Sequence, residues 1–287
     1  MRIVTHDSRF HTDDVFAVAT LLLLLGEVEV VRSRDPKVHA AADYLVDVGM
    51  QHNPLEHRFD HHQPEGAGIR ENGIPYASFG LVWKEHGEKL AGGKEEAEII
   101  DRRLVQAIDA HDNGVAVEEY KFEDVREYAI RDFLNSFVEA RDPESLYKTF
   151  MHVVGIAKDL LVREIKITKK LVEDQEKIIA CFETSSDKHL VVMDEAFIGW
   201  EKVLRKIPGV LYAIHPRPDG KWSMGAIQDD KYVSRKPLPK SWGGLKDEEL
   251  QKVTGVEDAI FAHRGLFMAA AKSKEGAIKL AEIALNA

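Results

Sequence analysis

The chain has 287 residues, of which 44% are hydrophobic and 31% are charged, which is ordinary for a soluble globular protein and long enough for two domains. Its formal net charge of -10, from 49 acidic and 39 basic residues, argues against binding of duplex nucleic acid over a broad basic surface. This charge suits a protein that binds divalent cations. The single cysteine, Cys181, excludes an intramolecular disulfide and a zinc finger, and it fits a reducing cytoplasm.

Short apolar runs and helical patterns alternate at the start of the chain. The pattern predicts three strands, at residues 2–6, 28–34 and 44–49. Between them it predicts a helix at residues 11–24 and a turn or second short helix at residues 37–43. This β-α-β-α-β order favours a parallel sheet covered by helices, and residues 57–62 would add a short fourth strand. We therefore expect an α/β fold.

The most apolar segment, residues 15–25, covers most of the first predicted helix and follows two acidic residues. It is too short to cross a bilayer, and no small-residue cleavage site comes after it. We expect a buried helix rather than a signal peptide, and a cytoplasmic protein with no membrane partner.

From Tyr76 to about Ala180 the periodicity is almost wholly helical, with predicted helices at 77–91, 95–114 and 157–179. The last of these is charged on one side and apolar on the other, which is typical of a connector or of a helix in a homodimer.

The strand signal returns near residue 181. Strands are predicted at 189–194, within 210–227 as a pair around a Pro-Asp-Gly turn, and at 260–263, before a closing helix at 274–285. The chain therefore divides, on this interpretation, into residues 1–180, with the parallel sheet and connecting helices, and a smaller α+β domain at residues 181–287.

Acidic and imidazole side chains stand at the predicted strand ends and at the start of the first helix, namely His6, His11, Asp13, Asp47, Asp60, His61 and His62. Each has a structural explanation when taken alone; Asp13, for example, would favour a helix N-terminus through the helix dipole. In a parallel sheet, however, these ends share one edge, and four loops that deliver carboxylates and imidazoles to one edge predict a site for Mn²⁺, Mg²⁺ or Zn²⁺.

A further acidic pair, Asp109 and Asp112, is spaced so that both project from one face of a helix that Asn113-Gly114 would end. Carboxylates are disfavoured near a helix C-terminus, and a nearby cation would relieve that repulsion. A solvated pair of acids at a helix end is the alternative.

The tripeptide Asp60-His61-His62 resembles the signature of the DHH phosphoesterase superfamily. Within it, the ordered segments resemble the melanocyte-proliferating-gene family of RNA exonucleases over nearly the whole chain; they are THDSRFHTDD, VRSRDP, LVDVG, RFDHHQ, IDAHDNG, LPKSWGGLKDEEL, GVEDAIFAH and SKEGAIKLA.

This resemblance implies two divalent ions, commonly Mn²⁺, held between an N-terminal catalytic domain and a smaller C-terminal substrate-binding domain. It implies metal ligands at His6, Asp13, Asp47, His61 and one of Asp109 or Asp112, of which the Asp-Asn-Gly context favours Asp112. His11 departs from the wider superfamily, which has a carboxylate there, and an imidazole shifts preference toward Mn²⁺ or Zn²⁺. His62 would contact the substrate phosphate, and Asp60 would orient its neighbours.

Basic side chains are the candidates for holding the rest of the substrate, namely Arg34, Arg217, His263 and Arg264. Trp222 and Trp242 could stack on bases, but core packing is the favoured interpretation of both. The stretch GLFMAAAKS replaces a glycine-rich turn of the family and leaves the details of substrate binding open.

These features predict a phosphodiesterase that releases nucleotides from single-stranded RNA or short oligonucleotides. The 3′–5′ direction of degradation is implied by the family resemblance alone. Two ions roughly 4 Å apart would activate a water and clamp the phosphate oxygens. Alternatives that share the site are hydrolysis of a small phosphoanhydride or of a cyclic dinucleotide. A relative that binds metal or RNA without turnover is a third alternative, although the complete ligand set argues against it.

Overall fold

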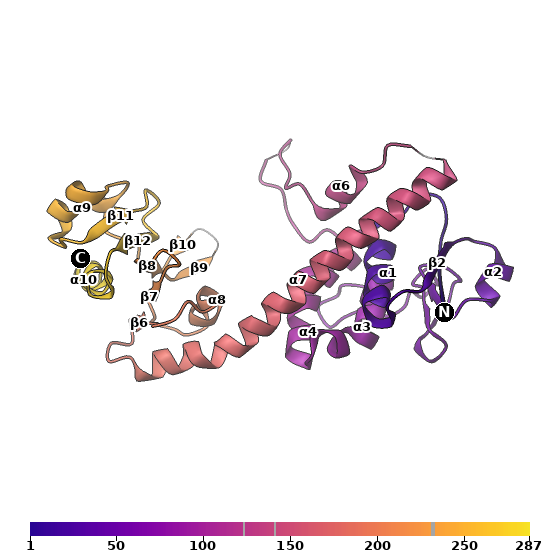
Figure 1. Cartoon of the computed structure of the whole chain (residues 1–287), viewed down its shortest axis with the longest axis horizontal. Coiled ribbons are helices and arrows are strands. Elements are labelled where there is room, and N and C mark those ends of the chain that lie inside the picture. The colour runs from indigo at the N-terminus through magenta and orange to yellow at the C-terminus, as the bar shows by residue number, and fades with distance from the viewer. Residues whose placement is uncertain (123, 141, 231–232) are drawn as a thin grey trace. The chain divides into compact units, whose positions relative to one another are not determined.

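The computed structural model describes residues 1–122, 124–140, 142–230 and 233–287. The chain forms two compact units, Met1–Lys169 and Lys170–Ala287. Helix α7 (Pro143–Thr184) begins in the first unit and ends in the second (Figure 1). The boundary predicted after residue 180 also lies within this helix, and the catalytic and substrate-binding roles of the two parts stay predictions.

The first unit contains a five-stranded sheet in the order β2-β1-β3-β5-β4. Its strands are β1 (Arg2–Thr5), β2 (Glu29–Arg32), β3 (Tyr44–Val46), β4 (His52–Asn53) and β5 (Arg58–Phe59). The first four in that order run parallel, as the β-α-β-α-β pattern predicted. The edge strand β4 pairs antiparallel with β5 and was not predicted, because two residues carry no periodicity.

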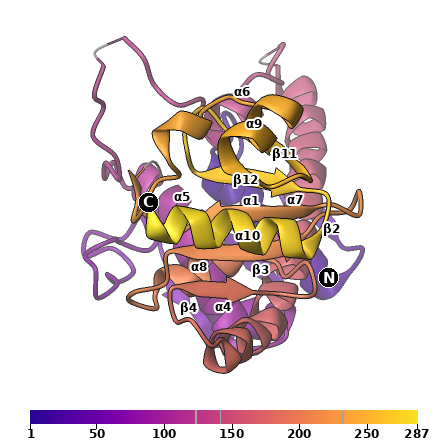
Figure 2. The ribbon, with the colours of Figure 1, turned by 90° about the vertical axis from the view of Figure 1, so that its left-hand side faces the viewer.

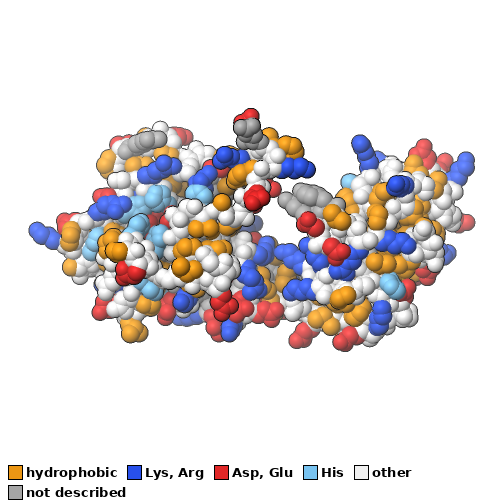
Figure 3. Space-filling model, turned by 180° about the vertical axis from the view of Figure 1, so that it is seen from behind, with side chains coloured by type: hydrophobic (Ala, Val, Ile, Leu, Met, Phe, Trp, Pro, Cys, Tyr) orange, Lys and Arg blue, Asp and Glu red, His pale blue; other side chains and the backbone are white. Residues whose placement is uncertain are grey.

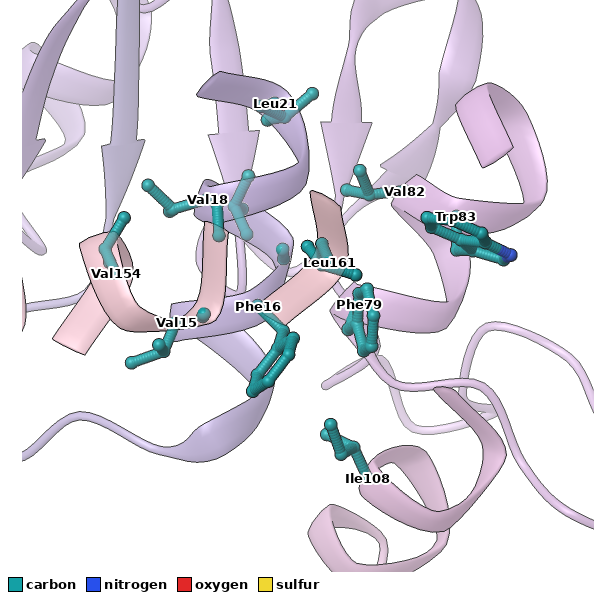
Figure 4. Close-up of a cluster of buried hydrophobic side chains, with 14 of the residues drawn as sticks. Val15, Phe16, Val18, Leu21, Phe79, Val82, Trp83, Ile108, Val154 and Leu161 are labelled. Carbon is teal, nitrogen blue, oxygen red and sulfur yellow. The ribbon is translucent and has the colours of Figure 1, made fainter. Parts of the chain in front are cut away.

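Helices surround this sheet, namely α1 (Thr12–Leu25), α2 (Pro36–Ala40), α3 (Ser78–Ala91), α4 (Lys94–Ile100), α5 (Gln106–Asp112), α6 (Ile130–Asn135) and the first part of α7. Figure 4 shows side chains of four helices meeting in one core: Phe16 from α1, Phe79 from α3, Ile108 from α5 and Leu161 from α7. Burying this apolar surface fixes the N-terminal ends of α1 and α3 beside the sheet.

The apolar segment at residues 15–25 is confirmed as a helix, and residues 15–21 of α1 are buried. Among the residues that the structure describes, no helix is both long and apolar enough to cross a membrane.

The prediction of an almost wholly helical stretch is wrong for residues 114–129, whose described part contains no helix. Val117, Tyr120 and Tyr128 are exposed there, so this stretch has no apolar face to pack on the core. The predicted helix at 95–114 is also interrupted, because a π-helical turn (Asp101–Val105) joins α4 to α5.

The second unit contains another five-stranded sheet, in the order β11-β12-β8-β7-β6, and a two-stranded β10-β9 pair. The strands are β6 (Leu190–Val192), β7 (Tyr212–Pro216), β8 (Trp222–Ala226), β9 (Gln228–Asp230), β10 (Val233–Ser234), β11 (Ala259–Ala262) and β12 (Met268–Ala271). Figure 2 shows α10 (Lys274–Asn286) lying across one face of the larger sheet. Two shorter helices are α8 (Trp200–Arg205) and α9 (Asp247–Thr254).

The predicted hairpin of this unit is confirmed, since β7 and β8 pair antiparallel around the Pro-Asp-Gly turn. Gly220 takes φ +78° there and donates its backbone N–H to the carbonyl of Arg217 at 3.0 Å. Strand β12 was not predicted. Its short Met-Ala-Ala-Ala sequence has no alternation of polar and apolar residues, and it becomes a strand by pairing with β8 and β11.

Candidate metal centre

The predicted strand-end residues do come together at one edge of the first sheet. His6 follows β1, Asp47 follows β3 and Asp60 follows β5, while His11 caps α1. Asp47 takes φ +56°, a left-handed conformation that Asp tolerates better than most residues. Figure 3 shows several histidines, in pale blue, gathered on one face of this unit.

One group of donor atoms centres on His6. Its Nε2 lies 3.2 Å from Oδ2 of Asp47 and 3.2 Å from Oδ2 of Asp14. Its Nδ1 lies 2.8 Å from the carbonyl of Asp7, which orients the ring so that Nε2 faces the carboxylates. His11 completes the group: donor atoms of His6, His11 and Asp47 lie within 4.8 Å of one another.

A second group centres on His61. Its Nε2 lies 3.1 Å from Oδ2 of Asp112 and 3.4 Å from Oδ1 of Asp47. Donor atoms of Asp13, His61 and Asp112 also lie within 4.8 Å of one another. Asp47 therefore turns one oxygen toward each group, as a carboxylate shared by two cations would.

The carboxylate of Asp13 is held by helix α3. It accepts the backbone N–H of Ser78 at 3.1 Å and of Phe79 at 2.7 Å, at the positive end of that helix. The next N–H, of Gly80, is accepted by Oδ1 of Asp109 at 3.0 Å. Carboxylates from α1 and α5 thus satisfy the N–H groups that open α3, which ties three helices together at the site.

Asp109 and Asp112 have different surroundings. Oδ2 of Asp109 lies 2.7 Å from Nη2 of Arg70, and the same Nη2 lies 3.0 Å from Asp101. Asp109 is thus already paired with a cation, whereas Asp112 faces His61. This geometry favours Asp112 over Asp109 as a metal ligand. Through its pair with Arg70, Asp109 would instead hold α5, which carries Asp112, in place.

Asp60 and His62 form a hydrogen-bonded pair beside the second group. Oδ1 of Asp60 lies 2.7 Å from Nδ1 of His62, and its Oδ2 accepts the backbone N–H of Met50 at 2.6 Å. The hydrogen bond that the His62 imidazole donates to Asp60 raises the pKa of His62, which is half exposed. Asp60 is buried and holds an imidazole that is open to solvent.

The electrostatics of the centre fit divalent cations. Burial, together with the charges of Asp47 and Asp112, raises the pKa of Asp13 well above its ordinary value. Burial would lower the pKa of His6 and His61, but neighbouring carboxylates outweigh it and raise them to about 10 and about 11. Within the described part of the chain, the buried atoms without a hydrogen-bond partner include Nε2 of His6, Nε2 of His61, Oδ2 of Asp14 and Oδ2 of Asp47. Crowded carboxylates and imidazole nitrogens are ligands that borderline divalent ions prefer.

Residues 2–285 match a model of the MYG1 exonuclease family, described as uncharacterised protein family UPF0160. The chain belongs to this family. It is similar to MYG1 exonuclease of Rattus norvegicus, at 28% identity over 326 residues that cover 99% of this chain and 84% of the rat protein. It is also similar to MYG1 protein C694.04c of Schizosaccharomyces pombe, at 28% identity over 325 residues that cover 100% of this chain and 98% of the yeast protein. The family predicted from the ordered motifs is thereby confirmed.

Among solved structures, the chain is similar to RecJ of Thermus thermophilus in complex with Mn²⁺, at 13% identity and a TM-score of 0.33. The match covers 100% of this chain but 52% of that one, so the chain spans about half of its length.

The basic candidates of this MYG1-family chain lie in both units. Arg34, in the first unit, is exposed, and its Nε lies 3.4 Å from Oδ1 of Asp7, next to His6 in the chain. In the second unit, Arg217 lines a cavity of about 880 Å³ with the rings of Trp200, Phe267 and others. Nη1 of Arg217 donates to Oγ of Ser223 at 3.4 Å.

His263 and Arg264 lie on the loop between β11 and β12. Nδ1 of His263 accepts the backbone N–H of Gly265 at 2.9 Å, and its ring centroid lies 4.2 Å from that of Phe267. Since Gly265 and Phe267 line the same cavity as Arg217, this loop forms part of its wall.

The core interpretation of the two tryptophans agrees with their burial. Trp242 is 2% exposed within the second core, and Trp222 packs against the same cluster. Neither lines the cavity of about 880 Å³ that Arg217 lines.

Two residues at the centre were missed from the sequence. Asp14 stands next to Asp13 at a helix N-terminus, where acidic residues are common, although its spacing from His11 is that of a capping box, which would have pointed its side chain back toward the site. Arg70 lies 31 residues from Asp101 and its pairing has no local signal.

Proposed function

We propose that this chain is a metal-dependent phosphodiesterase that releases nucleotides from single-stranded RNA or short oligonucleotides, with two Mn²⁺ ions as the preferred cofactors and Mg²⁺ or Zn²⁺ as the rivals. The observation that carries the proposal is Asp47, whose Oδ2 lies 3.2 Å from His6 and whose Oδ1 lies 3.4 Å from His61. His11 and Asp14 stand on the first side and Asp13 and Asp112 on the second, so the donors suit a pair of cations. The curated rat relative is named an exonuclease, which supports a nucleic-acid substrate.

Each residue has a role that follows from its surroundings. When bound, two divalent cations would supply Lewis-acid charge to the phosphate and a water of lowered pKa as nucleophile. Helix α3 holds Asp13 and the Arg70–Asp109 pair holds α5, so the ligands are fixed before substrate arrives. His62, whose pKa is raised by Asp60, would place positive charge on a non-bridging phosphate oxygen.

The second unit would bind the remainder of the substrate. Its cavity of about 880 Å³ combines aromatic walls with the guanidinium of Arg217, and single strands are held by base stacking and by cations on phosphates. Arg235 and Lys236 are poorer candidates, because Arg235 donates to the carbonyls of Ile207 and Val210 and Lys236 donates to that of Leu285.

The location and assembly of the protein are further parts of this proposal. A free, partly buried Cys181 suits a cytoplasmic protein, and the amphipathic α7 suits a connector or a homodimer contact. Size-exclusion chromatography with light scattering tests the dimer.

The deciding experiment is a substrate panel with Mn²⁺, Mg²⁺ and Zn²⁺ compared. Labelled single-stranded RNA, the matching DNA, pyrophosphate and a cyclic dinucleotide would be incubated with the purified protein. Mononucleotides released fastest from RNA with Mn²⁺ support the proposal. Faster cleavage of pyrophosphate or of the cyclic dinucleotide would assign the site to a small substrate instead, and RNA binding without any product would make the chain a binding protein.

A further inference from the structure

Asp14 lies at the first group of donor atoms although no motif assigns it. It is the second of two consecutive acids on α1, and it is fully buried. Its Oδ1 accepts the backbone N–H of His11 at 2.8 Å. This bond is half of a capping box, which is a sufficient structural reason for that one oxygen.

The capping role leaves the other oxygen unexplained. Oδ2 of Asp14 is buried, has no hydrogen-bond partner among the described residues and lies 3.2 Å from Nε2 of His6. Oδ2 of Asp47 also lies 3.2 Å from that nitrogen and likewise has no hydrogen-bond partner in the described part of the chain. Two buried carboxylate oxygens that face one imidazole nitrogen require a positive charge among these three atoms, which a bound cation would supply in place of a proton on His6.

The two distances from Nε2 of His6 are those expected between neighbouring ligands of one cation. Bonds of about 2.1 Å at right angles separate two donor atoms by roughly 3.0 Å. The distances of 3.2 Å from Nε2 of His6 to the two carboxylate oxygens are close to this separation. A hydrogen-bonded capping carboxylate has no need of that arrangement.

Charge gives an independent reason. The group His6, His11 and Asp47 contains a single carboxylate, and Asp47 turns its other oxygen toward His61. A divalent cation held by that group alone would keep a net positive charge in a buried place, whereas a second carboxylate neutralises it.

We propose that Asp14 is a ligand of the first cation, together with His6, His11 and Asp47. The inference rests on the proposed metal centre, and it names a ligand that the family resemblance did not assign. The set then holds two carboxylates and two imidazoles, which suits Mn²⁺ or Zn²⁺ over Mg²⁺.

The test is Mn²⁺ binding by the full chain, measured by calorimetry and by electron paramagnetic resonance. Asp14→Asn keeps an oxygen for the N–H of His11 and removes the charge. We expect the wild-type chain to bind two Mn²⁺ and the variant to bind one of them at least about tenfold more weakly. Asp174→Asn is the matched control, since Asp174 is a buried carboxylate of α7 paired with Lys170, and it should leave both affinities unchanged.

Equal Mn²⁺ affinity and stoichiometry in Asp14→Asn and wild type would overturn the inference. If the variant does not fold, the Mn²⁺-loaded wild-type crystal decides through anomalous scattering: Oδ2 of Asp14 within bonding distance of an ion supports the inference, and an ion beyond that distance overturns it. These readouts do not depend on turnover. A wild type that binds two Mn²⁺ but cleaves no substrate contradicts only the proposed function.

Discussion

Nη2 of Arg70 lies 2.7 Å from Oδ2 of Asp109, in a pair whose side chains are 7% and 0% exposed. The guanidinium carbon also lies 4.0 Å from the ring centroid of Tyr76. The same Nη2 also contacts Asp101, the first residue of the π-helical turn, so one guanidinium holds the start of that turn and Asp109 of α5 together.

Removing this cation should destabilise the protein strongly. Arg70→Met leaves Asp109 buried without its partner, and breaking a buried pair costs about 3–5 kcal/mol of unfolding free energy. Chemical denaturation of the metal-free protein measures the loss. Adding Asp109→Asn to the same chain should recover part of it, because the uncompensated charge is then gone; a double variant no more stable than Arg70→Met would contradict this account.

Gly80 leaves room for that carboxylate. A Cβ at Gly80 would lie 1.8 Å from Oδ2 of Asp109 and 2.8 Å from Nη2 of Arg70, so Gly80→Ala must displace the ion pair. We expect a loss of several kcal/mol in unfolding free energy, of the order found for a broken buried pair, and weaker Mn²⁺ binding through the shift of α5.

The matched control for that substitution is Gly155→Ala in α7. Gly155 is exposed in the helix, and a Cβ there would meet nothing within 4 Å. Alanine should stabilise the chain by about 0.5–1 kcal/mol because it restricts the unfolded backbone. Equal effects of the two substitutions would show that Gly80 is not specifically required.

Binding of Mn²⁺ should release protons. The pKa of His6 is raised to about 10 and that of His61 to about 11, both above the ordinary value of 6.5, so both imidazoles carry a proton at pH 7 in the metal-free protein. A ligand must be unprotonated, so cations compete with protons and the apparent affinity rises with pH. Calorimetry in buffers of different ionisation enthalpy counts the protons; an affinity that does not change between pH 6 and pH 8 would exclude this competition.

Arg217 should affect substrate binding and leave the metals alone. Arg217→Gln removes the guanidinium at the cavity wall, and we expect KM for single-stranded RNA to rise at least about tenfold with kcat little changed. Lys221→Gln is the control, because Lys221 lies on the same turn and pairs with Asp219 but does not line the cavity. A KM that rises equally in both variants would indicate a general charge effect.

The sequence predicted which side chains meet at the sheet edge where a rule of topology applied. Strands that run parallel end at one edge, so His6, Asp47 and His61 could be placed together from strand order alone. Asp112 was favoured for its context, and its contact with His61 agrees with that preference.

What the sequence missed depends on contacts between distant segments. Arg70 pairs with Asp109 from a separate part of the chain. The place of Asp14 at the centre depends on its contact with Nε2 of His6, on another element. Strand β12 exists because β8 and β11 pair with it on both sides. Periodicity and local spacing carry no information about such partners.

The most direct test of the central claim is a Mn²⁺ titration of the wild-type chain and of Asp47→Asn. Electron paramagnetic resonance measures the number of bound ions and the magnetic coupling between them. A shared Asp47 predicts two ions per wild-type chain, coupled to each other, and weaker binding of both in the variant. A single ion, two uncoupled ions, or an unchanged titration in Asp47→Asn would contradict the two-cation centre.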